Sequence, residues 1–336
     1  MRIWMKRDVW IAALSGALIL ALLPLTNGCR RVSQPRKLVL AYNSWVGFAP
    51  MFVAQDRGFF RKEGVELDLR LMEDTGAKGV ALKSGDIDGV GTTVDSFVIQ
   101  AGRGVPGKIM MAFDQSNGAD GIVAIEEIRS IEDLPGHKVA LQPGFVGHFF
   151  LLYLLDEAGI EPSSVTIEPM ETGAAGAAFV AGKVDAAVTW EPWLSKARER
   201  QGAHVLVSSR EEPGVIVDVF VMRPDVLAER RSDVLAFMRG WYHGLEYLQS
   251  QPDEALPIVA RVLHANESDV KEMLEGVKFM SLEENLQYFG TREEPGFIDH
   301  VVDVAARVWR EAGFLERKVD ASTIVDPDLL TELEAR

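Results

Sequence analysis

A tryptophan flanked by small polar residues stands directly after an apolar run that reads as a strand. The run 38–41 is LVLA, and Asn43, Ser44 and Trp45 follow it. An indole ring can cover a planar or methylated group, and the neighbouring amide and hydroxyl can form hydrogen bonds. In an open α/β fold, the loop at the carboxyl end of a strand lies where ligands bind. The pattern therefore predicts a binding loop, although a Trp packed in the core fits it equally well.

Alternating strand and helix patterns must position this loop. Short apolar or alternating runs predict strands at 38–41, 65–70, 87–91, 108–113, 137–141, 165–168, 184–189, 205–208 and 215–221. Helical patterns occupy 51–60, 79–84, 95–102, 147–158, 173–181, 193–200, 233–249, 253–263, 268–274 and 297–312. Asp95 has the residue type of an N-cap. This order predicts an α/β fold with largely parallel sheets, followed by a helical tail.

Two pairs of segments echo each other along the chain. The segment 40–47, LAYNSWVG, recurs in outline as ALQPGFVG at 140–147, and GDIDGVGT at 85–92 recurs as GKVDAAVT at 182–189. Either echo could arise by chance in glycine-rich turns. Both together, in the same order, favour two similarly wound lobes. In the tail, Phe297, Val301, Val304 and Val308 form one stripe, which predicts a helix packed on the first lobe.

The amino terminus has the pattern of an export signal. Three basic residues precede the apolar segment 11–23, which is too short to span a bilayer comfortably. Cys29, preceded by Gly28, resembles the lipoprotein cleavage site, although Thr26 stands where that pattern has an aliphatic residue. We predict a signal peptide over 1–29, a lipidated Cys29 and a polar tether over 30–36. A secreted protein with an unmodified thiol is the alternative.

Composition excludes several classes of function. Cys29 is the only cysteine, so the folded part has no disulfide framework, thiolate catalysis or cysteine metal site. The six His residues show no metal-ligand spacing, and we predict no metal and no cofactor. The formal net charge of −15 argues against nucleic acid and anionic membrane surfaces as partners.

An ordered series of segments runs through the chain: the Trp45 loop, LKSGDIDGVGTT, DQSNGADGIVA, DLPGHKVALQPG, AGKVDAAVTWEPW and GVIVDVFVMRPD. This series resembles the substrate-binding proteins of nitrate, sulfonate and taurine ABC importers, a family that also includes binders of thiamine precursors. The resemblance implies a two-lobed type II periplasmic-binding-protein fold with the ligand between the lobes. On this basis we expect lobe 1 over 37–120 and 219–336, and lobe 2 over 121–218.

The resemblance also implies partners and a location. A binding protein of this kind delivers a small ligand to a membrane permease driven by an ATPase. We expect a monomer held by its lipid anchor at the periplasmic or extracellular face, which is its only contact with the membrane. Two alternatives stay open: a ligand sensor that docks to a signalling protein, and an exported enzyme on the same fold. The enzyme would need an acid–base pair, for which His148 and Glu191 are the candidates.

In the two-lobed interpretation, aromatic side chains from both lobes meet at the cleft, together with hydroxyl side chains from lobe 1. Trp45 and Phe145 occupy corresponding turns and are expected to face each other, although Phe145 could equally pack on its own lobe. Carboxylates lie on the two presumed crossovers between the lobes, and a buried carboxylate needs a cation or a donor when the lobes close. The predicted ligand-binding residues are Asn43, Ser44, Trp45, Thr92, Thr93, Asp114, Ser116, Asp120, Phe145, His148, Trp190, Glu191 and Asp218.

The turn around Phe145 bears on the class of ligand. Relatives that bind sulfonate or nitrate commonly present hydroxyls at the start of the second-lobe helix, a helix end that suits anions. Here the turn reads GFVGH, without a hydroxyl, although His148 could donate to an oxyanion. We therefore predict a small nitrogen-containing ligand that is cationic or zwitterionic. A planar ligand is included in this prediction. A simple oxyanion is the alternative.

Overall fold

A computed structural model describes residues 37–335, which lie in one compact unit. The predicted signal peptide, Cys29 and tether lie outside the described residues. No helix within residues 37–335 has the length and apolar character that crossing a bilayer requires.

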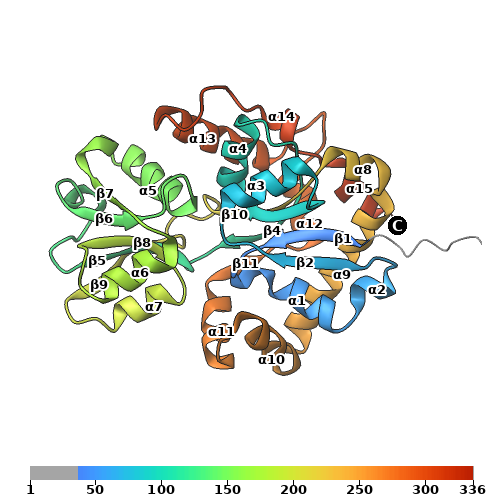
Figure 1. Cartoon of the computed structure of the whole chain (residues 1–336), viewed down its shortest axis with the longest axis horizontal. Helices are drawn as coiled ribbons and strands as arrows, with labels where there is room; N and C mark the ends of the chain where they lie inside the picture. The colour runs from blue at the N-terminus through green and yellow to red at the C-terminus, as the bar shows by residue number, and fades with distance from the viewer. Residues whose placement is uncertain (1–36, 336) are drawn as a thin grey trace, which may run out of the picture. The chain divides into compact units, whose positions relative to one another are not determined.

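The strands form two separate sheets, which confirms the predicted α/β architecture (Figure 1). We call lobe 1 the six-stranded sheet, in the order β11-β4-β10-β3-β1-β2, with the helices packed on it. Its strands are β1 (Leu38–Tyr42), β2 (Leu67–Leu71), β3 (Gly89–Thr93), β4 (Lys108–Ser116), β10 (Val217–Met222) and β11 (Val277–Phe279). Lobe 2 is the five-stranded sheet β7-β6-β8-β5-β9 with its helices. Its strands are β5 (Asp120–Ile125), β6 (Lys138–Leu141), β7 (Thr166–Pro169), β8 (Ala186–Trp190) and β9 (Ala203–Ser208).

Helices cover both faces of each sheet (Figure 1). Lobe 2 carries α5 (Val146–Glu157), α6 (Thr172–Val180) and α7 (Trp193–Arg198). Lobe 1 carries α1 (Ala49–Asp56), α2 (Phe59–Lys62), α3 (Thr75–Ser84), α4 (Val94–Gly102), α8 (Pro224–Glu229), α9 (Arg231–Ser250), α10 (Pro252–Leu263), α11 (Glu267–Glu275), α12 (Leu282–Phe289), α13 (Phe297–Glu311), α14 (Ala321–Ile324) and α15 (Asp328–Glu334). The predicted helix over 51–60 is divided, because Gly58 adopts a left-handed conformation between α1 and α2.

The alternating pattern predicts largely parallel sheets, but both sheets are mixed: β10 and β11 run against their neighbours in lobe 1, and β5 runs against its neighbours in lobe 2. β10 lies antiparallel between β3 and β4, and β5 lies antiparallel between β8 and β9. We predicted a strand from 215 that would leave one lobe and enter the other, but β10 belongs wholly to lobe 1. The run at 120–125 was not predicted as a strand. The chain changes sheets at 117–119 and 209–216, and the predicted domain boundaries stay a prediction.

An aromatic cluster packs against the lobe 1 sheet. Phe113 of β4 lies 4.7 Å from the ring centre of Phe220 on β10, and both contact Trp241 of α9. Successive side chains of a strand point to opposite faces. Burying Phe113 in this cluster therefore directs its neighbour Asp114 toward the other face, and a rigid apolar layer holds the strand in place.

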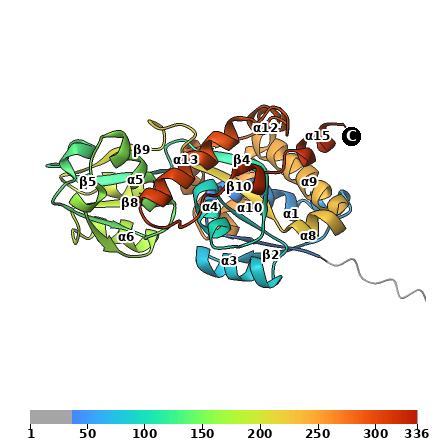
Figure 2. The same cartoon turned by 90° about the horizontal axis from the view of Figure 1, so that it is seen from above.

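The last long helix packs on lobe 1, and its buried face is wider than the predicted stripe. Val301 and Val308 of that stripe are buried, whereas Phe297 is 54% exposed. The buried face also includes Ile298, Val302, Ala305 and Trp309. In both views α13 lies beside α5 of lobe 2 (Figures 1 and 2), so this helix connects the two lobes.

Candidate functional site

A small cavity lies between the two sheets. Its volume is about 20 Å³, little more than the space that one water molecule needs. A ligand of several non-hydrogen atoms therefore requires its walls to move apart. The lining residues are Asn43, Trp45, Lys78, Thr92, Thr93 and Asp218 from lobe 1, Asp120, Phe145, Val146 and Trp190 from lobe 2, and Ile216 from the second crossover.

The carboxyl edge of the lobe 1 sheet supplies the polar wall of this cavity. Thr92 and Thr93 end β3, and Asp218 begins β10, which runs in the opposite direction. In the strand register, Asp218 lies directly opposite Thr93 on one side and Asp114 on the other. Directly opposed side chains of antiparallel strands are close neighbours, so the sheet itself sets two carboxylates side by side.

Trp45 is both a wall of the cavity and a hydrogen-bond donor. Its indole Nε1 donates to Asp114 Oδ2 at 3.1 Å, and both residues are buried. The other oxygen, Asp114 Oδ1, is buried without an N–H or hydroxyl partner. Trp45 is therefore both a packed core residue and a residue of the cavity wall. The edge of its ring orients the Asp114 carboxylate beside the cavity. Whether the ring touches a ligand stays a prediction.

Burial opposes ionisation of the two opposed carboxyl groups. Burial raises the pKa of Asp114 to about 7, against the hydrogen bonds from Trp45 and Asp218. Burial, and then the charge of Asp114, raises the pKa of Asp218 well above its usual value. Two buried carboxylates on directly opposed positions of neighbouring strands resist simultaneous ionisation. The proton held by Asp218 can then bond to Asp114, which lacks another donor on Oδ1.

Two further aspartates extend this acidic wall. Burial raises the pKa of Asp120 to about 7, and the charges of Asp95 and Glu191 add to the rise while the Ser116 hydroxyl opposes it. Burial likewise raises the pKa of Asp95 to about 6, against hydrogen bonds from Thr93 and Ser96. Asp95 is not the N-cap that its residue type predicts, because α4 begins at Val94 with Thr93 in the cap position. Within residues 37–335, no cluster of His, Cys, Asp or Glu is placed to hold a metal ion.

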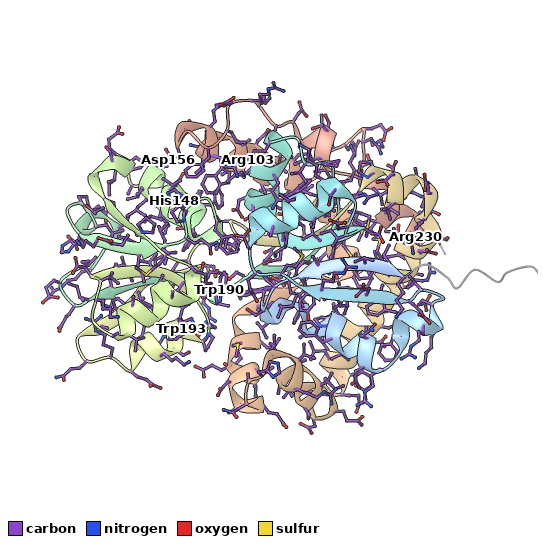
Figure 3. All side chains as sticks on the ribbon, in the orientation of Figure 1. Arg103, His148, Asp156, Trp190, Trp193 and Arg230 are labelled. Carbon is purple, nitrogen blue, oxygen red and sulfur yellow. The ribbon has the colours of Figure 1, made fainter. Side chains whose placement is uncertain are left out.

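Lobe 2 contributes aromatic rings. The Phe145 and Trp190 rings meet edge to face with their centres 5.6 Å apart, and Trp190 lies at the boundary between the lobes (Figure 3). Phe145 immediately precedes α5, and Trp190 ends β8. The structure thus brings Phe145 and Trp45 to one cavity, as predicted from the echo, but the aromatic partner of Phe145 is a residue of its own lobe.

Five predicted ligand-binding residues lie outside the cavity lining: Asp114, which bonds to Trp45, and Ser44, Ser116, His148 and Glu191. Ser44 is exposed, and its backbone N–H donates to Glu73. Ser116 bonds to Ser209 at 2.7 Å and accepts from the Asp120 N–H, so it ties the two crossovers together. Glu191 accepts two hydrogen bonds from Ser195 at the start of α7. The geometry assigns these residues structural tasks, and their ligand roles stay predictions.

His148 also lies outside the cavity lining. Its ring packs edge to face against Trp309 and Phe314, and its Nδ1 accepts the Gly144 N–H at 3.1 Å. Burial lowers the pKa of His148 to about 4, so the ring is neutral. The hydrogen bonds of His148 and Glu191 go to different partners, which leaves the acid–base pair of the enzyme alternative without geometric support.

Polar contacts also join the lobes outside the cavity. Arg307 of α13 bonds to Asp156 of α5 at 2.6 Å, and Ser195 of α7 bonds to Glu272 of α11 at 2.6 Å. Both Asp156 and His148 lie on the α5 side of lobe 2 (Figure 3). These contacts hold the lobes close, which explains why the cavity between them is small.

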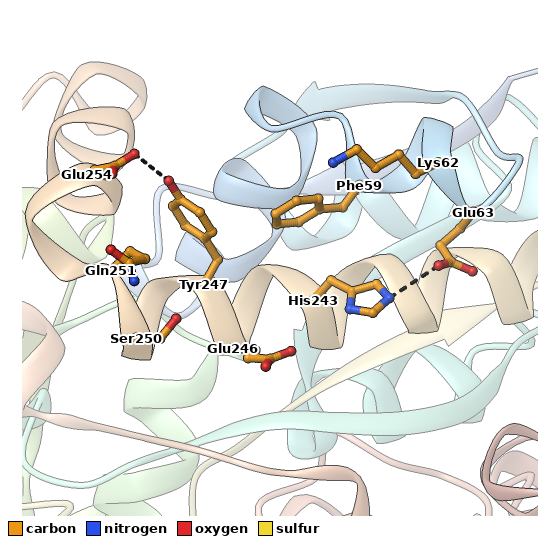
Figure 4. Close-up of a pocket in the computed structure, with 9 residues that line it drawn as sticks. All are labelled: Phe59, Lys62, Glu63, His243, Glu246, Tyr247, Ser250, Gln251 and Glu254. Atoms are coloured by element: carbon orange, nitrogen blue, oxygen red, sulfur yellow. Dashed lines mark hydrogen bonds and ion pairs between the residues drawn. The ribbon is translucent and has the colours of Figure 1, made fainter.

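A larger hollow of about 590 Å³ lies within lobe 1, between α2, α9 and the start of α10 (Figure 4). Two pairs of its polar groups bond to each other: His243 contacts Glu63 at 3.2 Å, and the Tyr247 hydroxyl bonds to Glu254 at 2.5 Å. It draws no residue from lobe 2. Size alone therefore does not make it the ligand site, whereas the small cavity holds buried groups whose bonding is incomplete.

Gly47 is expected to be essential for the Trp45–Asp114 contact. A Cβ atom at position 47 would overlap Asp114 Oδ2 and Trp45 Nε1. We expect Gly47→Ala to break this hydrogen bond, lower stability by about 1–3 kcal/mol through overpacking and weaken ligand binding at least about tenfold. Urea denaturation and calorimetry measure both effects. Gly76→Ala is the matched control, since its Cβ would have Asp74 Oδ1 as nearest neighbour at 3.2 Å. Equal behaviour of the two variants would contradict the assigned role.

Comparison with known proteins identifies relatives of this chain and of its fold. The chain is 26% identical over 293 residues to the taurine-binding periplasmic protein of Escherichia coli, covering 84% of this chain and 88% of that protein. The crystal structure of the periplasmic aliphatic sulphonate binding protein SsuA from Escherichia coli has a TM-score of 0.74 at 19% identity, covering 89% of this chain and 100% of SsuA. The two-lobed periplasmic-binding-protein fold is thereby confirmed.

The same fold also carries an enzyme. The desulfurization enzyme DSZB has a TM-score of 0.62 at 14% identity, covering 90% of this chain and 99% of DSZB, so the fold does not by itself distinguish binding from catalysis. The family model described as NMT1/THI5 like matches residues 45–255. The match begins at Trp45 and takes in both crossovers and all of lobe 2, which confirms the resemblance inferred from the motifs. The chain belongs to the NMT1/THI5-like family.

Proposed function

We propose that this protein is the extracytoplasmic solute receptor of an ABC importer, and that its ligand is a small molecule with an ammonium or similar N–H-rich group. The single observation that carries the ligand class is a set of buried carboxyl groups: Asp120 and Asp218 line one cavity, and Asp114 bonds to Trp45 of its wall. The receptor role is supported by the family and by the names of the relatives. A permease and its ATPase are the partners, and the ligand passes to them when the lobes open.

The electrostatics of the cavity favour a cationic group over a simple anion. Burial alone pushes the carboxyl groups toward their neutral forms. An ammonium group supplies several N–H donors and a positive charge, so it stabilises the ionised carboxylates and satisfies their oxygens. A nitrate or an alkyl sulfonate would instead add negative charge beside them. The aromatic rings of Trp45, Phe145 and Trp190 can cover the apolar part of the ligand or attract its cation.

A simple oxyanion is the second candidate, and one observation favours it. Lys78 places a buried ammonium group in the same cavity, and the relatives are named for taurine and aliphatic sulphonates. Calorimetry of the purified protein with a panel of amines, amidines, sulfonates and nitrate separates the two candidates. We expect binding of compounds with an ammonium or amidinium group. Binding of sulfonates or nitrate without any amine-containing compound would overturn the proposed ligand class.

The location follows from the predicted leader. We propose that Cys29 carries the lipid anchor and that the folded part lies at the outer face of the cytoplasmic membrane or in the periplasm. Fractionation of cells that express the wild-type chain and a Cys29→Ser variant provides the test. The wild type is expected in the membrane fraction and the variant in the soluble extracytoplasmic fraction, and an identical distribution of the two would contradict lipidation.

A further inference from the structure

A lysine that the sequence analysis did not select lies inside the cavity. Lys78 lies on α3, one turn after the N-cap residue Asp74, and only 1% of its surface is exposed. Its Nζ has one hydrogen-bond partner, the Gly91 carbonyl oxygen at 3.5 Å. Within residues 37–335 it forms no ion pair shorter than 4.0 Å. The protein thus buries this cation without a direct counter-ion.

The bonding of Lys78 is incomplete. An ammonium group has three N–H donors, and a buried charge is costly unless it is paired and hydrogen-bonded. Burial lowers the pKa of Lys78 to about 8, and the charges of Glu73, Asp218 and Asp74 oppose that fall. The group is therefore still mainly charged at neutral pH, with donors that the surrounding protein does not use.

Two uncharged polar side chains line the same cavity from the same lobe. Asn43 follows β1, and Thr92 stands next to the end of β3. Neither side chain forms a hydrogen bond within the part of the chain that the structure describes. An amide and a hydroxyl can each donate to an oxyanion. Asn43, Thr92 and Lys78 therefore provide hydrogen-bond donors for an anion, which the ionised carboxylates beside them cannot provide.

We propose that Lys78 binds the anionic end of a zwitterionic ligand, whose ammonium end lies among Asp114, Asp120 and Asp218. This inference rests on the proposed function and narrows it, because the ligand must carry an oxyanion, a sulfonate or a carboxylate, as well as an ammonium group. A simple amine would leave Lys78 buried without an anion, and a simple anion would leave the carboxylates without a cation. Lys78 is then the residue that distinguishes zwitterions from simple amines.

The test compares four small compounds on the wild-type protein and on Lys78→Met. Taurine and β-alanine carry both charges with different oxyanions, ethylamine carries only the ammonium, and ethanesulfonate carries only the anion. The substitution keeps the length of the side chain and removes its charge. Lys83→Met is the matched control, since Lys83 is an exposed lysine of the same helix. Calorimetry gives the affinities, and circular dichroism verifies the fold. Lys78→Gln replaces Lys78→Met if the latter does not fold.

We expect the wild type to bind taurine or β-alanine at least about tenfold more tightly than ethylamine. Lys78→Met should lose that advantage and bind ethylamine as the wild type does, and Lys83→Met should behave as the wild type. The identity of the stronger zwitterion decides between sulfonate and carboxylate. Equal losses for zwitterion and amine in Lys78→Met, or no loss for either, would overturn the role of Lys78 and leave the proposed function standing. Wild-type binding of ethanesulfonate alone, or of none of the four compounds, would overturn the proposed ligand class and this inference with it.

Discussion

Replacing Asp218 with Asn is expected to stabilise the ligand-free protein at pH 8 and to weaken its binding of ammonium compounds. Asp218 is buried and lies opposite Asp114 in the strand register, so ionising both carboxyl groups is unfavourable. An amide removes one of the two negative charges. One pKa unit corresponds to about 1.4 kcal/mol, and relief of the repulsion is therefore expected to add at least about 1 kcal/mol to the free energy of unfolding.

The raised pKa of Asp218 determines how the stability gain of Asp218→Asn varies with pH. The folded-state pKa of Asp218 is raised, mainly by burial, so the folded protein retains a proton that the unfolded chain releases as pH rises above about 4. The carboxyl group thus lowers the stability of the wild type increasingly from about pH 4 upward, until the folded form also ionises. The advantage of Asp218→Asn is accordingly small near pH 4 and largest at pH 8.

Urea denaturation at several pH values measures the stability effect, and calorimetry measures the loss of ligand affinity. A hydrogen bond to a charged group contributes about 1.5–3 kcal/mol, so the affinity for an amine-containing ligand should fall between about tenfold and a hundredfold. Asp303→Asn is the control, because Asp303 is an exposed residue of α13. A variant that is less stable than the wild type at pH 8, or that binds amines unchanged, would show that Asp218 serves the fold and not the ligand.

The affinity for an amine-containing ligand is expected to rise steeply between pH 5 and pH 7. Asp114 and Asp120 have pKa values raised to about 7 by burial, so the empty site holds protons in this range. Binding an ammonium group requires ionised carboxylates, and the protons must leave. If one proton is released, the affinity changes roughly tenfold per pH unit on the acidic side. The other titratable groups facing this cluster are Asp95, Glu191 and Lys78.

Above pH 8 the two ligand classes should separate. Loss of the Lys78 proton, whose pKa burial lowers to about 8, removes the partner of an oxyanion but not that of an ammonium group. The affinity for a zwitterion should therefore pass through a maximum, provided that the ligand itself stays protonated. Calorimetry in two buffers with different ionisation enthalpies counts the protons released. Affinity that is constant from pH 5 to pH 7, or that falls, would contradict the assignment of these carboxylates to the ligand.

Several features of this protein can be predicted from residues that are adjacent in the chain. The alternation of strands and helices, the echo between the lobes and the polar loop after the first strand all depend on residues adjacent in the chain, and they agree with β1, β3, α4, α5 and β8. Hydrophobic period and turn residues act over one element at a time. They therefore indicate the fold class, the loop that contains Trp45 and the family motifs.

Lys78 lines the cavity but is not among the ligand-binding residues predicted from the sequence. A lysine on a helix ordinarily extends into solvent, so residue type alone predicts an exposed side chain at position 78. One signal was present: Lys78 stands four residues before Leu82, which is fully buried on the same helix, and residues four apart share a face. His148 is the opposite case, because it was predicted to bind the ligand but lies outside the cavity lining. Trp309 of helix α13, from a distant part of the chain, packs against its ring.

The sequence by itself determined the class of fold and the loop from which Trp45 reaches the cavity, since each depends on short-range pattern. It also predicts an export signal. Only the tertiary structure decided which side chains meet. The insertion of β10 between β3 and β4 sets Asp218 against Asp114 and Thr93, and packing of the Trp45 loop brings the indole to Asp114. Strand order and register join segments far apart in the chain, and no local pattern encodes the charge that two such segments create when they are buried together.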